Sequence, residues 1–135
     1  MVMRSSNTAV FLIASACLLP GAASAATGSY MCAFTDVYEC ETVTGCQRAS
    51  LHAINIPEFI VIDLDKKQLT GASVSDAHRT EDIEGMTSTD KLIFLHGTQD
   101  EETWNATVTL ETGALAGGIT SGSSSFAVFG NCTPK

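Results

Sequence analysis

Four cysteines are the residues whose type and spacing most directly predict chemistry in this chain. Cys32, Cys40, Cys46 and Cys132 all lie beyond the first 25 residues. An even number of cysteines in a small exported chain predicts disulfides rather than a metal centre. Of the three pairings that four cysteines allow, we favour Cys40–Cys46 as a local clip and Cys32–Cys132 as a link between the chain ends. Either alternative joins a middle cysteine to the far end and leaves Cys32 bonded within the first loop.

The other chemical groups form no motif with a known reaction. No histidine pair has metal-ligating spacing, and Cys-x-x-Cys is absent. The acidic groups at Asp63 and Asp65 and at Asp100–Glu102 lack the alternating ligands and the glycine of a calcium loop. There is no Gly-x-Ser-x-Gly elbow and no phosphate loop. We therefore expect no catalytic residue, no bound metal and no cofactor.

The first 25 residues have the order of regions found in a secretory signal peptide. Arg4 precedes an apolar run at 9–19, and Ala23-Ser24-Ala25 is a small-x-small cleavage site. The run is shorter than the roughly 20 residues that a membrane span requires. The sequence predicts a signal peptide over 1–25 and a single domain over 26–135, exported to the periplasm or secreted. Lipidation at Cys17 is the alternative for this leader.

The charge balance of the predicted mature chain narrows the classes of partner. Residues 26–135 carry six Lys and Arg against 15 Asp and Glu, a net charge of −9. Phosphate and anionic lipid surfaces require clustered Lys and Arg, so nucleic acid and anionic membranes are excluded as partners. A basic protein partner fits this charge, and solubility alone also explains it. The sequence does not define an oligomeric state.

Alternating and β-branched residues predict strands along most of the chain. The strongest signals are 28–34, with Tyr30, Cys32 and Phe34 on one face, and the apolar runs 59–64 and 91–97. Clipped irregular strands are expected over 35–48, a short strand over 50–55 and one strand over 79–86.

Residues 103–132 predict three more strands joined by tight turns. Trp104, Ala106, Val108 and Leu110 alternate with polar residues, which indicates one buried face. In the last strand, Phe126 and Val128 oppose Ala127 and Phe129, so we expect cover on both sides.

Two segments share one hairpin pattern. Residues 62–71 and 108–117 both have the order apolar-x-Leu-acid-x-x-x-Leu-x-Gly, which suits a strand, a turn and a return strand whose glycine bends or meets another backbone. No helical period extends beyond the leader. The sequence therefore predicts an all-β fold, an antiparallel meander that forms a small barrel or sandwich and is stapled by disulfides.

Several short motifs together resemble an uncharacterised family of small exported proteins of Gram-negative bacteria. They are Glu39-Cys40, Gly45-Cys-Gln-Arg48, Asn55-Ile-Pro-Glu-Phe59, the Trp104 strand with its Thr112-Gly113 turn, and Phe129-Gly-Asn-Cys132. The resemblance implies a periplasmic address and assigns no functional residue. Periplasmic lysozyme inhibitors are similar in size, export signal and barrel architecture, a likeness at the level of the fold alone.

These observations favour a non-catalytic module that binds or inhibits a protein partner. The acidic residues Asp100, Glu101 and Glu102 are the candidate partner-binding loop, and lysozyme is one basic target that would fit it. The alternatives are a small β-barrel that carries an apolar ligand and a structural protein of the cell envelope. A packed interior with no cavity would exclude the carrier.

Overall fold

The computed structural model describes residues 26–72 and 79–135. The predicted signal peptide lies outside this range. Within it, ten strands form one antiparallel sheet without any helix. The strands are β1 (Ser29–Glu41), β2 (Gly45–Ala49), β3 (Phe59–Asp63), β4 (Gln68–Ala72), β5 (Arg79–Asp82), β6 (Gly85–Ser88), β7 (Leu92–Gln99), β8 (Glu102–Thr109), β9 (Ala114–Ser121) and β10 (Ser124–Pro134). The predicted all-β class is confirmed.

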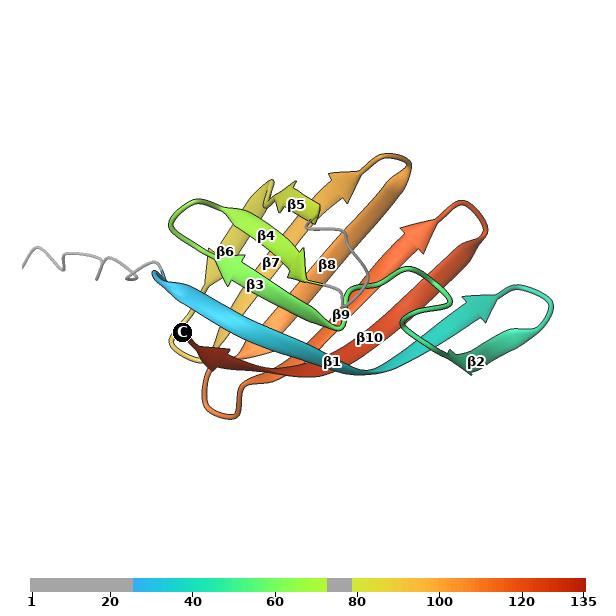
Figure 1. Ribbon diagram of the computed structural model, residues 1–135, viewed down its shortest axis with the longest axis horizontal. Helices are drawn as coiled ribbons and strands as arrows, with labels where there is room; N and C mark the ends of the chain where they lie inside the picture. Colours follow the sequence, from blue (N-terminus) through green and yellow to red (C-terminus); the bar gives the residue numbers. More distant parts are fainter. Residues whose placement is uncertain (1–25, 73–78) are drawn as a thin grey trace, which may run out of the picture.

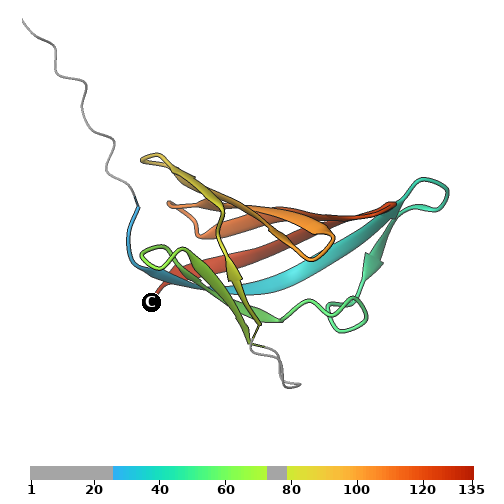
Figure 2. The same ribbon diagram turned by 90° about the horizontal axis from the view of Figure 1, so that it is seen from above.

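The first and last strands form the centre of the sheet. The strand order is β5-β4-β3-β1-β10-β9-β8-β7-β6, and β2 pairs with β1 beside β3. Two meanders, β3 to β5 and β6 to β10, are thus joined by the pairing of β1 with β10 along nearly their whole lengths. The sheet curls into a half-barrel (Figure 1), and Figure 2 shows its two walls, with the β5–β6 segment passing from one to the other.

The inward side chains follow the predicted alternation. Trp104, Ala106 and Val108 of β8 are buried, and Ile93 and Leu95 of β7 are buried opposite them. Together with inward residues of β1, β3, β9 and β10 they form the hydrophobic core. The walls therefore pack against each other because the strands that form the core supply apolar residues at alternate positions.

The last strand is not covered on both faces as predicted. Val128 is buried on the concave side, whereas Phe129 is 42% exposed on the convex side. It has an edge-on contact with Tyr38, at a ring-centroid distance of 6.2 Å. A single curled sheet has no second layer, so no element is available to cover the outward side chains.

The segment before β3 is not the strand predicted over 50–55. It forms consecutive turns, in which Ala53 N donates to Ser50 O at 3.1 Å and Ile56 N donates to Leu51 O at 2.9 Å. The reason is topological. Both β2 and β3 pair with the same edge of β1, so the chain between them must leave the sheet and return.

The single strand predicted over 79–86 is two strands, interrupted at Ile83 and Glu84. Ile83 N donates to Lys67 O at 2.8 Å, whereas Glu84 N donates to His96 O at 3.0 Å. These acceptors belong to opposite walls of the half-barrel, next to β4 and within β7. The chain therefore changes partner here, and the buried Ile83 side chain fills the space between the walls.

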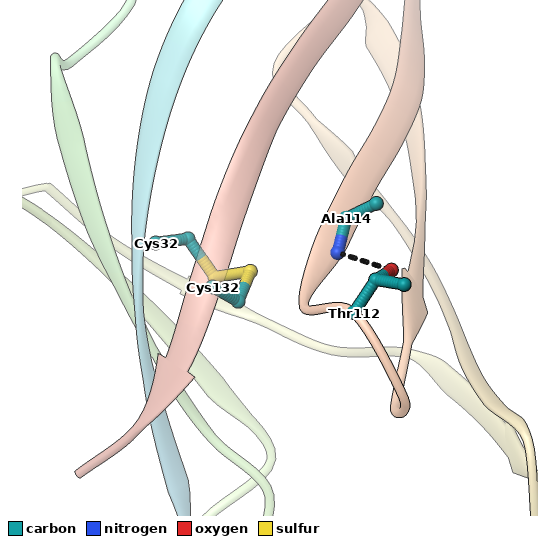
Figure 3. The surroundings of a disulfide bond; sticks show 4 residues. All are labelled: Cys32, Thr112, Ala114 and Cys132. Carbon is teal, nitrogen blue, oxygen red and sulfur yellow. Dashed lines mark hydrogen bonds between the residues drawn. A yellow bond between two sulfur atoms is a disulfide. The ribbon is translucent and has the colours of Figure 1, made fainter.

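Both predicted disulfides are present. Cys40 pairs with Cys46 across the β1–β2 hairpin, and Cys32 pairs with Cys132 across the central strands, where the two residues are directly opposite. Figure 3 shows the β8–β9 turn beside the Cys32–Cys132 bond. Cys132 N donates to Gly113 O at 2.7 Å. Gly113 has a φ of +74°, and a Cβ there would lie 2.2 Å from Cys132 O, so this turn requires glycine.

Two disulfides in so short a chain are compatible with an oxidising environment. Across residues 26–72 and 79–135, no helix is long and apolar enough to cross a membrane.

We predict that the two disulfides contribute unequally to stability. Cys32–Cys132 spans 100 residues and Cys40–Cys46 spans 6. Loop-closure entropy then predicts losses in the free energy of unfolding of about 4 and about 2 kcal/mol for the respective double alanine variants. Urea unfolding of the two variants beside the wild type measures both losses. A larger loss for Cys40→Ala/Cys46→Ala would contradict the prediction.

Candidate functional site

A hollow of about 790 Å³ lies on the concave side of the half-barrel. It begins where the packed core ends. The core cluster surrounds the Cys32–Cys132 disulfide, whereas the cavity is lined by inward residues farther along the same strands. One half of the interior is therefore closed by side chains and the other half is open.

The floor of the cavity is apolar. It is formed by inward side chains of the long strands β1, β8, β9 and β10, which alternate with residues of the convex face. These floor residues are Phe34, Trp104, Ala106, Ile119, Phe126 and Val128.

Small residues in the sheet keep this half of the interior open. Ala106 of β8 lies opposite Gly117 of β9. A Cβ at Gly117 would lie 2.4 Å from the Asn105 carbonyl oxygen, so the backbones of β8 and β9 approach too closely for a side chain there. This agrees with the predicted role of the glycine at the end of the hairpin pattern. Ala106 lines the cavity and fills less of the interior than the leucine and isoleucine residues of the packed part.

The turns before β3 provide a second wall. Ile54, Ile56 and Pro57 line the cavity, and Pro57 rests on Gly71 of β4. A Cβ at Gly71 would lie 2.6 Å from Pro57 Cγ, so glycine is required for the proline ring to sit against β4. Gly71 is the counterpart of Gly117 in the repeated hairpin pattern. The Pro57 ring occupies the space beside Gly71, whereas the backbone of β8 occupies the space beside Gly117.

Trp104 connects the packed core to the cavity floor. It belongs to the core cluster, lines the cavity and is 9% exposed. Its ring lies over Gly97 of β7, where a Cβ would be 2.7 Å from Cζ2. The indole Nε1 is buried and has no hydrogen-bond partner among the described residues. Since Trp104 is the single tryptophan of the chain, its fluorescence reports on this cavity.

The rim of the cavity is acidic. Glu81 of β5 and Glu102 at the start of β8 lie on opposite walls, and Asp100 and Glu101 form the turn between β7 and β8. Asp100 has a φ of +52°, a conformation that aspartate adopts more readily than most residues. Among the described residues, Arg79 is the one basic side chain of the lining. Within this part of the chain, four carboxylates therefore surround the opening against one guanidinium.

Burial changes the pKa of one of these carboxylates, that of Glu81. Desolvation raises the pKa of Glu81 above its ordinary value, and the nearby charges of Glu102 and Asp100 raise it further, while Arg79 lowers it. The ionised form of Glu81 is thus disfavoured at this position. The shift also indicates that the β5 and β8 sides of the rim are electrostatically coupled.

The structure brings the predicted acidic loop to the cavity and adds residues that the sequence did not single out as a site. Asp100, Glu101 and Glu102 all line the opening. In the sequence, Arg79 and Glu81 belong to a cluster of polar residues, His78-Arg79 and Glu81-Asp82, which a solvated strand end explains. In the structure Arg79 and Glu81 are half-buried on the concave side, opposite Gly71 and Leu69. Arg79 and Glu81 precede the apolar Ile83 at intervals of two residues. This spacing in the sequence could have indicated that all three side chains face inward.

In the described part of the chain, no group of three or more His, Cys, Asp or Glu residues is arranged to hold a metal ion. Comparison of the chain with models of protein families, with curated proteins and with solved structures finds no match. The cavity is therefore the feature of the molecule from which a function can be inferred.

We predict that Glu81→Gln stabilises the protein at neutral pH. Because the folded-state pKa of Glu81 is raised, the folded state holds its proton more tightly than the unfolded state. This stability is present at low pH and is lost as the pH rises through the folded pKa. Removing the charge should raise the free energy of unfolding at pH 7 by up to about 0.5 kcal/mol, a limit that allows for the partial exposure of the side chain.

The gain should shrink when urea unfolding is repeated at pH 4. Glu111→Gln, at the exposed turn after β8, is the control that changes net charge equally. A gain that is equal at both pH values, or equal in the control, would show that Glu81 is not the responsible group.

Proposed function

We propose that the protein is a periplasmic or secreted binding protein that holds an apolar small molecule in the cavity of its half-barrel. The observation that carries this proposal is the open half of the interior, about 790 Å³ with an apolar floor. Binding sites for small molecules are concave, mostly apolar and about 300–1,000 Å³ in volume. This cavity has the size and the chemistry of such a site.

The distribution of residue sizes supports the proposal. The fold packs its other half with isoleucine, leucine and valine around the central disulfide. In the open half, Ala106 and Gly117 occupy facing inward positions. Unfilled apolar surface loses dispersion contacts, so an empty cavity costs stability. A ligand that buries this surface would recover that stability and bind with a corresponding affinity.

The chemistry of the lining supports binding rather than catalysis. Its residues in the described chain include neither histidine nor cysteine, and Ser121 is the one hydroxyl among them. A serine nucleophile requires a base within hydrogen-bond reach. The lining offers carboxylates at the rim and aromatic rings on the floor, groups that recognise a ligand.

The proposal predicts binding of the neutral apolar dye N-phenyl-1-naphthylamine, with a rise in dye fluorescence and a change in Trp104 emission. Ala106→Leu adds three carbon atoms to the floor and should weaken binding about fivefold, from roughly 0.3 kcal/mol for each displaced ligand atom. The matched control is Ala116→Leu, an exposed residue on the convex side of β9. Equal affinity in all three proteins, or no dye binding by the wild type, would overturn the proposal.

A second candidate function is favoured by the β7–β8 turn, where Asp100 and Glu101 are exposed at the mouth of the cavity. An exposed acidic turn suits a basic protein partner such as lysozyme, which would be inhibited on binding. This function predicts slower lysis of cell walls by lysozyme when the protein is added. The double variant Asp100→Lys/Glu101→Lys should abolish the effect, whereas Asp90→Lys/Glu111→Lys should retain it. Undiminished lysis with the wild type would exclude lysozyme as the partner.

A further inference from the structure

The charges around the cavity opening are poorly balanced from within the protein. The two ion pairs of the described chain, Arg48–Asp36 and Lys66–Asp63, both lie away from the cavity. In the described residues, none of the side-chain hydrogen bonds involves the four rim carboxylates. Arg79 alone offsets part of this charge. A negative potential therefore covers the entrance to an apolar site.

The two inward carboxylates are placed to act on one bound group. Glu81 projects from β5 on one wall, since it is opposite the inward Leu69. Glu102 precedes Trp104 by two residues on β8, so its side chain has the same inward direction from the other wall. Both line the cavity. A group at the mouth thus lies between two carboxylates, with the apolar floor beyond it.

We infer that the ligand of this cavity is an amphiphile with a positively charged head, an organic ammonium group held between Glu81 and Glu102 while its apolar body covers the floor. This inference rests on the proposed binding function and specifies its ligand class. The apolar floor favours ligands with an apolar surface, and the acidic rim favours ligands with a positive charge.

The surroundings of Glu81 support this inference. Desolvation raises the pKa of Glu81, the charge of Arg79 lowers it, and the charges of Glu102 and Asp100 raise it. A cation bound at the mouth would offset these unfavourable terms, whereas an anion would add to them. Binding of a cation is therefore coupled to the ionised form of Glu81.

The test compares three probes with the same ten-carbon chain and different heads: decylammonium, decanol and decanoate. Each is titrated against the full mature protein at pH 7.5, below the concentration at which it forms micelles, and displaces N-phenyl-1-naphthylamine. We expect decylammonium to bind about tenfold more tightly than decanoate, with decanol between them. The preference should decrease when salt is raised from 20 to 500 mM, since salt screens charges at an open mouth.

Two double variants test whether the rim carboxylates cause the preference for the cation. Glu81→Gln/Glu102→Gln should weaken decylammonium about fivefold, in line with partly exposed charge pairs, and leave decanol unchanged. Asp90→Asn/Glu111→Gln removes the same charge from the turns β6–β7 and β8–β9. These turns meet through Leu110 N and Lys91 O at the opposite end of β7 and β8 from the rim, so this control should bind all three probes as the wild type does.

The outcomes separate the inference from the function on which it rests. If decanol binds but decanoate binds as tightly as decylammonium, the cavity is an apolar site without charge selection and the inference is wrong. If the control double variant loses as much affinity as the rim variant, the effect is one of net charge, and the inference is also wrong. If neither the dye nor any decyl probe binds, the proposed function itself fails.

Discussion

The pairing of β1 with β10 is the interaction on which the rest of the structure depends. It joins the two meanders into one sheet, and without it β3 to β5 and β6 to β10 would be separate small sheets, linked by the chain at Ile83 and Glu84. Cys32 and Cys132 fix the register of this pairing by a covalent bond between directly opposite residues. The position of the cavity follows, because Phe34 and Val128 reach its floor from these two strands.

The half-barrel divides its interior by residue size. Around the disulfide, isoleucine and leucine from both walls meet and exclude water. Farther along the long strands, Ala106 and other residues line the cavity, and the carboxylates of Glu81 and Glu102 lie at its rim. The same alternation therefore supplies a core, a floor and a charged rim in succession. One part of the long strands stabilises the fold, and another part of the same strands lines the proposed binding site.

The sequence predicted features that depend on neighbours along the chain, and it missed those that depend on the opposite wall. The alternation of Trp104, Ala106 and Val108 and the cysteine pairing needed local pattern and chain length alone. The break at Ile83 arises because Lys67 and His96 accept hydrogen bonds on different walls. Glu81 becomes part of a rim because Glu102 faces it from β8. The proposed site thus forms because the sheet curls, and no local sequence pattern predicts that curl.

The pairing of β1 with β10 has a consequence for how the protein forms. β10 supplies the second edge of β1, and the opposed residues Cys32 and Cys132 are separated by 100 residues. Strand pairing over so long a separation forms slowly. Until it forms, β1 has an unpaired edge, through which it can associate with another chain.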